Sequence, residues 1–288
     1  MTVLSIDLNQ RPVAIGGVGG SGTRIVAAML EKLGFFIGGD LNEANDNLWF
    51  TLFFKRSEIL SASDEEFTRL VRIFISKMTN SVARDERLSR MLNALADRDR
   101  PQHTREWLNE RVQSFLDRST DTVGGTGRWG WKEPNTHIVI DRMRCCVPRL
   151  KYIHVIRNGM DMAFSANQNQ LTVWGPTLLG KDFGMTPRHS LKFWCVAHRR
   201  ILAVAKTMLP DFLLLNYDDM CRAPERSIAA LLDFLDVKPA AQDMITDLTQ
   251  LIRPPESLGR HRHHSRQTFD AEDLAYVRDL GFEVEGSP

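Results

Sequence analysis

The feature that most constrains this chain is a short apolar segment that runs directly into a cluster of glycines. Residues 12–15 are apolar, and five glycines fall within the next seven residues, 16–22. Apolar side chains then recur at helical spacing from Ile25 to Leu33, and Gly34 stands where a C-terminal cap belongs. A strand, a glycine turn and a helix in this order form the opening unit of a parallel α/β sheet.

The rest of the chain continues this alternation. Further strands are predicted at 129–132, 151–156 and 211–217, and helices at 191–208, 224–234 and 242–252. Because strands alternate with helices, we predict a P-loop-like α/β fold with a mostly parallel sheet and helices on both faces. Between about residues 42 and 118, apolar residues recur every three or four positions, which predicts an α-helical insertion within a single domain that spans residues 1–288.

Net charge and cysteine spacing limit the partners and the cellular compartment that we expect. The formal net charge is +1, so nothing draws the whole chain to nucleic acid. The four cysteines show no CxxC spacing, which favours reduced thiols over a disulfide framework or a zinc site. Residues 1–11 lack the apolar run of a signal peptide, and 18 consecutive apolar residues occur nowhere. We therefore expect a cytoplasmic protein without a membrane span, whose oligomeric state stays open.

The glycine cluster is a candidate phosphate cradle, since glycines let the backbone amides at a helix start approach an anion. Two common nucleotide-binding patterns match it only in part. Gly17 and Gly22 have the spacing of a nucleoside triphosphatase loop, but Thr23 takes its lysine position and Arg24 its Ser/Thr position. The same segment fits a dinucleotide fingerprint by letter, and Asp40 lies roughly where a ribose-binding acid would stand.

A second candidate anion site follows the predicted strand at 151–156. Arg157 and Ser165 stand eight residues apart there. On a continuous helix eight residues cover about 2.2 turns, so both side chains would share one side of the element. Arginine offers a planar fork to phosphate, and the serine hydroxyl adds a further donor. A dinucleotide fold needs no such pair after its later strand.

The glycine segment also resembles the sulfotransferase loop that binds a 5′-phosphosulfate, which usually has a lysine or arginine followed by Ser-Gly-Thr. The residues that carry this resemblance are Gly19, Gly20, Ser21, Gly22, Thr23 and Arg24. Here Gly20 takes the place of the basic residue, and Arg24 supplies a positive charge four positions on.

The second site resembles the 3′-phosphate motif of the same family. Arg157 and Ser165 match its arginine and serine, and Gly259 and Arg260 fall in a stretch that is similar to the C-terminal loop that closes on the 3′-phosphate. Tyr217 stands in a segment like the family's Tyr-Glu-Asp-Leu, where we expect a structural task. The resemblance implies 3′-phosphoadenosine 5′-phosphosulfate (PAPS) as the cofactor, with 3′-phosphoadenosine 5′-phosphate as its product.

Sulfuryl transfer is an in-line displacement that needs a base for the acceptor, cations for the departing oxygen, and alignment. Lys132 resembles the family lysine that lies near the bridging oxygen or the 5′-phosphate. Asp40 and Glu43 follow the first helix, where carbohydrate and protein-tyrosine sulfotransferases place a carboxylate base. The cytosolic small-molecule branch instead uses a histidine at the position that Pro134 occupies here. Glu133 and His137 are weaker candidates.

The sequence therefore predicts a sulfotransferase that acts on a hydroxyl, or an amine, of a carbohydrate or small-molecule acceptor. No metal is expected, because His261, His263 and His264 have no partners at ligand spacing. Residues 170–187 are apolar but rich in turn formers, which suits either a lid over the acceptor or an interface loop. A nucleotide kinase-like transferase, a dinucleotide-dependent oxidoreductase and a non-catalytic nucleotide binder remain alternatives.

Overall fold

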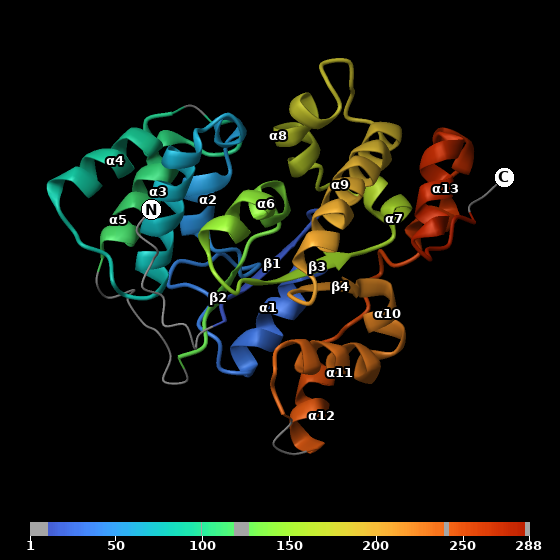
Figure 1. The fold of residues 1–288 in the computed structure, drawn as a ribbon. Helices are drawn as coiled ribbons and strands as arrows, with labels where there is room; N and C mark the ends of the chain where they lie inside the picture. Colours follow the sequence, from blue (N-terminus) through green and yellow to red (C-terminus); the bar gives the residue numbers. More distant parts are fainter. Residues whose placement is uncertain (1–10, 99, 118–126, 239–241, 286–288) are drawn as a thin grey trace. The chain divides into compact units, whose positions relative to one another are not determined.

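The computed structural model describes residues 11–98, 100–117, 127–238 and 242–285. Its centre is a four-stranded, all-parallel sheet in the order β2-β1-β3-β4 (Figure 1). The strands are β1 Val13–Gly17, β2 Gly130–Lys132, β3 Lys151–Ile156 and β4 Phe212–Asn216. The predicted α/β fold with a parallel sheet is confirmed, and all four strands stand within a few residues of their expected places.

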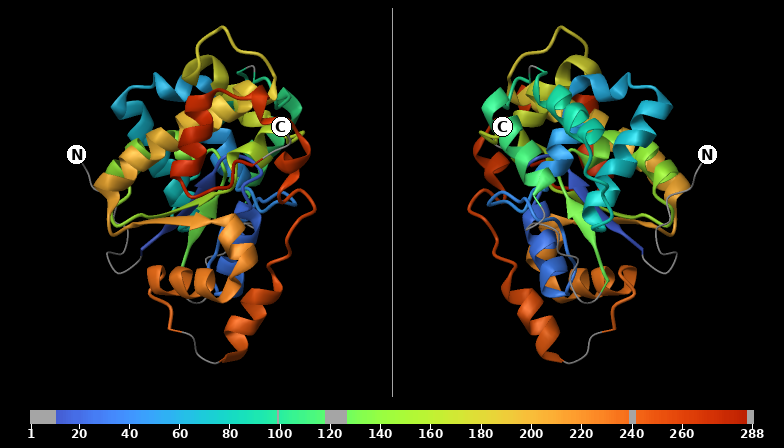
Figure 2. Two further views of the ribbon diagram at one scale, coloured as in Figure 1. Left: turned by 90° about the vertical axis from the view of Figure 1, so that its right-hand side faces the viewer. Right: turned by 90° about the vertical axis from the view of Figure 1, so that its left-hand side faces the viewer.

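The chain divides into two compact units. The first comprises the residues up to Gly16 together with Val26–Tyr152, and the second comprises Gly17–Ile25 together with the residues from Ile153 onward. Helices lie on both faces of the strands in each unit (Figures 1 and 2). In the first, α1 and α6 lie on opposite faces of β1 and β2, and in the second, α9 and α11 lie on opposite faces of β4.

The first unit places a bundle of helices beside β1 and β2. Its elements are α1 Thr23–Lys32 (which begins in the second unit), α2 Leu48–Phe54, the 3₁₀ turn η1 Ser57–Leu60, α3 Asp64–Met78, α4 Glu86–Ala96, α5 Arg105–Leu116 and α6 Thr136–Cys146. Strands β1 and β2 pair in register, with Val13 opposite Gly130 and Ile15 opposite Lys132. Helices α2 to α5 thus occupy the stretch that the sequence predicts to be a helical insertion.

Polar caps and buried aromatic rings explain why these helices form where they do. The side chains of Asn47, Ser63, Asp85 and Thr104 cap α2, α3, α4 and α5 by accepting a bond from a first-turn amide. Helix α2 buries every residue, and the ring of Phe50 lies within 6.4 Å of Trp131 on β2. This packing holds the loop that precedes α2 against the carboxyl end of β2.

The second unit surrounds β3 and β4 with shorter elements. They are α7 Gly159–Ala163, α8 Asn169–Leu178, α9 Pro187–Met208, α10 Tyr217–Arg222, α11 Pro224–Phe234, α12 Gln242–Gln250, η2 Arg260–His263, η3 Arg266–Thr268 and α13 Ala271–Asp279. Helix α7 packs closely on α9, where a Cβ at Gly159 would lie 2.7 Å from the Trp194 ring. Glycine is therefore required at the start of α7.

Two local expectations differ from the structure. Helix α7 ends at Ala163, so Arg157 and Ser165 do not share one helix, and the argument from 2.2 helical turns is wrong. The turn-rich stretch at 170–187 begins with helix α8, although Gly175 and Pro176 lie inside it. A Cβ at Gly175 would lie 2.6 Å from the Phe183 ring, so this glycine serves close packing rather than a turn.

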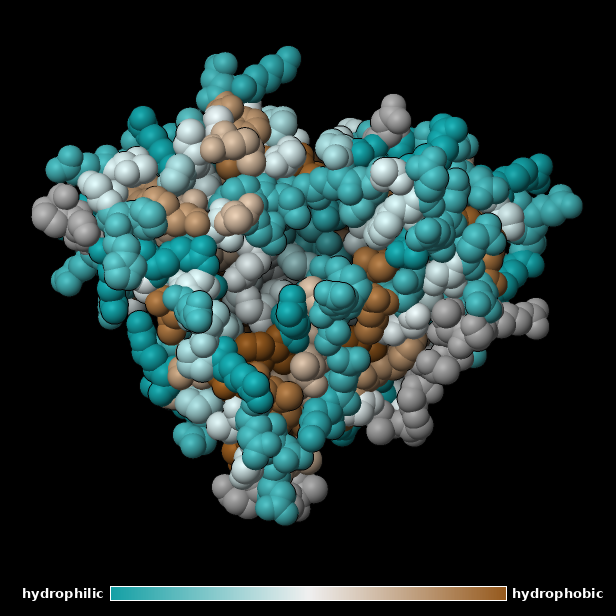
Figure 3. All heavy atoms as spheres, turned by 180° about the vertical axis from the view of Figure 1, so that it is seen from behind, coloured by the Kyte–Doolittle hydropathy of each residue, from teal (hydrophilic) through white to brown (hydrophobic). Residues whose placement is uncertain are grey.

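Polar side chains dominate one face of the molecule. On the face drawn in Figure 3, hydrophilic side chains cover most of the area and apolar atoms show in smaller groups between them. In the described part of the chain, no helix combines the length and apolar character that a membrane crossing requires. The same residues contain no group of three or more His, Cys, Asp or Glu side chains arranged to hold a metal ion.

Candidate active site: a nucleotide cradle and an acidic pocket

The glycine loop, residues 18–22, belongs to the second unit and leads into α1. Ser21 N donates to Val18 O at 3.1 Å, which closes a tight turn. The Ser21 side chain is 1% exposed, and its Oγ has no hydrogen-bond partner among the described residues. A buried hydroxyl without a partner is costly, so a ligand oxygen at this loop would satisfy a group that the chain leaves open.

The other predicted loop residues differ in exposure. Thr23 is buried at the first position of α1, Gly19 is half-buried, and Gly20 and Arg24 are exposed. The first turn of α1 carries no acidic side chain, so nothing there neutralises the positive end of the helix dipole. An anion at this loop would therefore meet backbone amides and a helix N-terminus. Arg24 is the nearest cation in the sequence.

Tyr217 supports this loop from behind. Gly22 has a φ of +95°, and a Cβ there would lie 2.2 Å from Cδ2 of Tyr217, so only glycine fits. The guanidinium carbon of Arg157 lies 5.5 Å from the centroid of the same ring. Tyr217 thus touches both predicted anion sites, which the sequence pattern did not reveal.

Arg157 directly follows β3 and is only 7% exposed. Its Nη1 lies 3.5 Å from Gly20 O in the glycine loop. Its Nη2 donates to the carbonyl and the hydroxyl of Ser257, at 2.6 and 3.0 Å, and lies 3.6 Å from Oδ2 of Asp161. Its Nε is buried and has no partner in the described part of the chain. The two predicted anion sites therefore lie within reach of one side chain in one unit.

The remaining predicted cofactor residues gather at the end of α7. Ser165 lies two residues beyond the helix and is half-buried. Gly259 N donates to Asp161 Oδ2 at 2.7 Å, and Arg260 Nη1 donates to Phe164 O at 3.1 Å. The C-terminal loop that contains Gly259 and Arg260 thus lies against α7, although these residues follow Ser165 by more than 90 positions.

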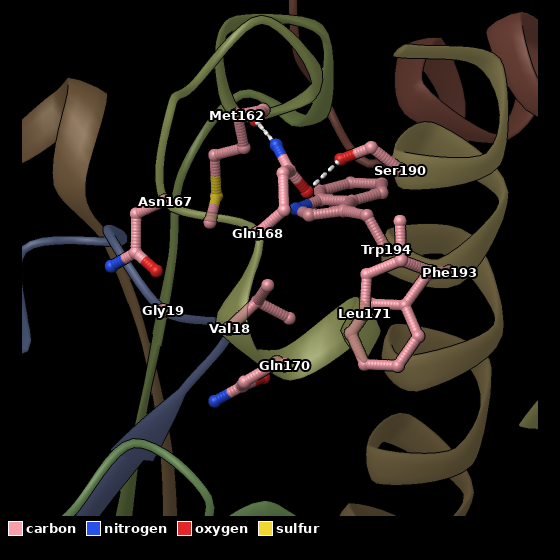
Figure 4. Close-up of a pocket in the computed structure, with 10 residues that line it drawn as sticks. All are labelled: Val18, Gly19, Met162, Asn167, Gln168, Gln170, Leu171, Ser190, Phe193 and Trp194. Carbon is pink, nitrogen blue, oxygen red and sulfur yellow. Dashed lines mark hydrogen bonds between the residues drawn. The ribbon is translucent and has the colours of Figure 1, made fainter. Parts of the chain in front are cut away.

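Side chains from α8 and α9 back the glycine loop. A small cavity of about 10 Å³ lies beside Val18 and Gly19 (Figure 4), and this volume suits at most a water molecule. Gln170 on α8 donates from Nε2 to Gly17 O at 3.1 Å. Ser190 on α9 donates to the amide oxygen of Gln168 at 2.7 Å. The bond from Gln170 ties α8 to the end of β1, directly before the glycine loop.

The first unit contains a separate, open pocket of about 740 Å³. We call it the acidic pocket, because its lining includes the carboxylates Asp40, Glu43, Asp46 and Glu133 against the two cations Lys55 and Arg111. On its wall the rings of His103 and Trp107 stack at 4.2 Å between centroids. Burial lowers the pKa of His103 to about 4, so this histidine is neutral near pH 7.

Asp40 is the most enclosed of the predicted bases. Its carboxylate lies 3.2 Å from Nε of Arg111, and the Arg111 guanidinium lies 4.9 Å above the Trp107 ring. Burial raises the pKa of Asp40, while a hydrogen bond from Ser114 and the charge of Arg111 oppose that rise. A carboxylate with a raised pKa is a better proton acceptor, as a general base requires.

Lys132 is buried, at 2% exposure, beside the loop that carries the acids. Its Nζ donates to Ala44 O at 2.9 Å and to Oδ1 of Asp46. The other oxygen of Asp46 accepts a bond from Asn42 Nδ2 at 3.0 Å. Glu43, in contrast, is exposed. The predicted catalytic residues Lys132, Asp40 and Glu43 thus come together in the first unit, with Asp46 as an additional acid.

Glu133 is a further acid, and the sequence indicates it only as a weaker candidate for the general base. It follows β2, is 2% exposed and lines the acidic pocket. Both of its oxygens accept bonds from Asn135, at 2.5 Å from the backbone N and 2.8 Å from Nδ2. Burial, and secondarily the charge of Asp46, raise the pKa of Glu133 to about 7, against the opposing charge of Lys55. Its place directly after Lys132 is the only signal in the sequence.

A model of the sulfotransferase family matches residues 12–241. A comparison with curated proteins finds no match.

Several solved structures are similar at low identity. The sulfotransferase STF9 from Mycobacterium avium is 16% identical, with 96% of this chain and 79% of that chain covered and a TM-score of 0.49. The sulfotransferase domain of the Synechococcus PCC 7002 olefin synthase is 16% identical, with 99% and 100% covered and a TM-score of 0.46. Retinol dehydratase, solved with androsterone and the inactive cofactor PAP, is 16% identical, with 93% and 69% covered and a TM-score of 0.35. Because the family model spans most of the sequence, the chain belongs to the sulfotransferase family.

Proposed function

We propose that this protein transfers a sulfuryl group from PAPS to a hydroxyl, or an amine, of a carbohydrate or small-molecule acceptor. The observation that carries the proposal is the position of Arg157, which lies 3.5 Å from Gly20 O and so joins the two predicted anion sites within one unit. PAPS carries negative charge at both of these ends, the 5′-phosphosulfate and the 3′-phosphate. A single nucleotide can therefore use both sites together.

The second unit has the donors that such a nucleotide needs. The 5′-phosphosulfate would be held by the amides of residues 19, 20, 22 and 23 and by the unpartnered hydroxyl of Ser21. The 3′-phosphate would be held by Arg157, whose buried Nε also lacks a described partner, together with Ser165, Gly259 and Arg260. Unsatisfied buried donors at both places support the fit, because an anion would satisfy them.

The chemistry assigned to the first unit is acid–base work on the acceptor. When bound, PAPS supplies the sulfuryl group. Asp40 or Glu43 would take the acceptor proton, and Lys132 would supply positive charge near the departing oxygen. Of the two acids, Asp40 is favoured by its enclosure and raised pKa, and Glu133 is a third candidate because its pKa stands near 7.

The lining of the acidic pocket supports a polar acceptor. Apart from Leu41, Leu48 and the Trp107 ring, its residues present hydrogen-bonding or charged groups. A lining dominated by polar groups suits a sugar or a small polyol better than a steroid or a long acyl chain. The excess of acids over cations disfavours an acceptor that is already anionic.

Calorimetry with adenosine 3′,5′-bisphosphate, NAD and ATP tests the nucleotide assignment. We expect clearly tighter binding of the bisphosphate, by roughly a factor of ten or more, which is 1.4 kcal/mol. Tighter binding of ATP would favour a kinase-like transferase, and tighter binding of NAD would favour a dinucleotide-dependent oxidoreductase.

Transfer is then measured as PAP release from PAPS with a panel of neutral sugars, amino sugars and simple phenols. Tight bisphosphate binding without release to any acceptor would indicate a non-catalytic relative. A cytoplasmic location remains a prediction from the cysteine pattern.

A further inference from the structure

The C-terminal loop, defined here as residues 257–264, is fastened to α7 by a buried carboxylate. The Asp161 side chain is completely buried and lies on α7. Its Oδ2 accepts from Gly259 N at 2.7 Å, and its Oδ1 accepts from His261 N at 3.0 Å and from His261 Nδ1 at 2.6 Å. Three bonds from one short loop therefore converge on a single carboxylate.

This carboxylate is ionised. Burial alone would raise the pKa of Asp161, but the bonds from the His261 ring, His261 N and Gly259 N outweigh burial and lower it. Because an ionised carboxylate can only accept, Nδ1 of His261 must carry the proton in this bond. The His261 side chain is itself 2% exposed, so this bond is shielded from water.

The same loop determines where the phosphate-binding arginines lie. Ser257 O accepts from Arg157 Nη2 at 2.6 Å and from Arg260 Nε at 3.3 Å, so two cations meet at one carbonyl. Nη2 of Arg157 also lies 3.6 Å from Asp161. Two guanidinium groups this close repel each other, and the nearby carboxylate offsets part of that repulsion. A loop that shifted away from α7 would move Ser257 and Arg260 together and leave Arg157 without its main acceptors.

A second contact fastens the far end of the loop. The His264 ring stacks on Phe164, just beyond α7, with 3.8 Å between centroids and 14° between planes. Arg260 Nη1 donates to the carbonyl of the same Phe164 at 3.1 Å. His264 is exposed, whereas His261 is buried, so the directional bonds of His261 contribute more to the loop position than the exposed stack does.

We propose that His261 is a positioning residue which, through Asp161, holds Arg157 and Arg260 in place for a 3′-phosphate and so sets the preference for a 3′-phosphorylated nucleotide. This inference rests on the proposed function, because it assigns the specificity of the same nucleotide site. His261 is not expected to touch the nucleotide. If His261 only supported the fold, its loss would weaken every nucleotide alike. We expect its loss to weaken only a nucleotide that carries the 3′-phosphate.

The test compares two nucleotides in three variants. Adenosine 3′,5′-bisphosphate and adenosine 5′-monophosphate differ only in the 3′-phosphate, and their affinities are measured by calorimetry. In His261→Leu we expect bisphosphate affinity to fall roughly 10- to 100-fold, the scale for losing one buried charged hydrogen bond. Monophosphate affinity should stay nearly constant. His261→Asn, whose amide can donate from near the Nδ1 position, should restore most of the preference, and His261→Gln, whose amide reaches farther, should not.

The matched control is His263→Leu, an exposed histidine two positions away in the same 3₁₀ turn, which should leave both affinities unchanged. Thermal unfolding of each variant shows whether it is folded, and His261→Gln replaces His261→Leu if the latter is not. Equal losses for both nucleotides, or no loss for either, would overturn the inference. Failure of the unmodified protein to prefer the bisphosphate would instead overturn the proposed function, so the two failures are distinguishable.

Discussion

The two candidate sites are built by different means. The proposed nucleotide cradle, residues 18–24 with Arg157 and the loop at 257–260, lies in the second unit, and the acidic pocket lies in the first. The cradle uses backbone amides, carbonyls and two arginines, and tight contacts such as Gly22 against Tyr217 leave it little freedom. The pocket uses side chains, mainly carboxylates such as Asp40 and Glu133, whose pKa values are raised by burial. Binding a fixed anion requires donors in fixed places, whereas activating an acceptor requires groups that can exchange a proton.

The largest expected effect concerns the pocket. Asp40→Asn should lower the single-turnover rate of sulfation roughly 10²- to 10⁴-fold, as for loss of a general base, and leave bisphosphate binding intact. Glu43→Gln is the competing candidate, and we expect a smaller loss because Glu43 is exposed. Glu110→Gln is the control, since Glu110 contacts the same Arg111 from an exposed position outside the pocket lining. Near-normal sulfation rates in both Asp40→Asn and Glu43→Gln would exclude a general base in the segment between α1 and α2.

The next effect concerns the cradle. Arg157→Ala should weaken adenosine 3′,5′-bisphosphate by about 2–5 kcal/mol, the scale for removing one partner of a buried charge pair. Arg262→Ala is the matched control, because Arg262 lies on the C-terminal loop that Arg157 contacts but is exposed and paired with Glu283 at the surface. Its effect should stay below about 1 kcal/mol. Unchanged affinity in Arg157→Ala would mean that the 3′-phosphate lies elsewhere.

A smaller effect separates packing from backbone strain within the glycine loop. Gly20 and Gly22 have nearly equal φ values, +93° and +95°, but only Gly22 faces an obstacle, the Tyr217 ring. Gly20→Ala should cost about 1–2 kcal/mol from left-handed backbone strain. Gly22→Ala should cost a further 1–3 kcal/mol or so from overpacking and weaken bisphosphate binding more. Denaturant unfolding measures the loss of stability, and calorimetry measures the loss of bisphosphate affinity. Equal effects of the two substitutions would show that the Tyr217 ring moves aside at little cost.

The same contrast explains what the sequence could predict. The glycine loop and Arg157 could be predicted as candidate phosphate ligands, because each stands within a short stretch at the end of a strand, β1 or β3. The strands themselves were visible as apolar runs. The partners Tyr217 and Ser257 were not identifiable as such, because they stand 60 and 100 residues beyond Arg157 and meet it only in the fold.

The failed local expectations have physical causes of the same kind. Helix α7 ends early because Gln168 donates to the carbonyls of Met162 and Ser165, at 3.1 and 2.8 Å, and so satisfies groups that a longer helix would have paired. Helix α8 continues through Gly175 because Phe183 packs on it. In both places a side chain several positions away outweighs local propensity.

A pH dependence of the stability singles out Glu133. Burial raises its pKa from an ordinary value of 4.5 to about 7 in the folded protein. Below about pH 4.5 the carboxyl is protonated in both folded and unfolded chains, and its contribution to stability is fully present. As the pH rises toward 7, the unfolded chain releases the proton first, so this contribution is lost, and above pH 7 no further change follows.

Glu133→Gln cannot titrate, so the free energy of unfolding of the unmodified protein should fall relative to that of the variant between pH 4.5 and 7. Parallel curves for Glu133→Gln and the unmodified protein would show that the pKa of Glu133 is not raised, and Asp40 would then be favoured over Glu133 as the base.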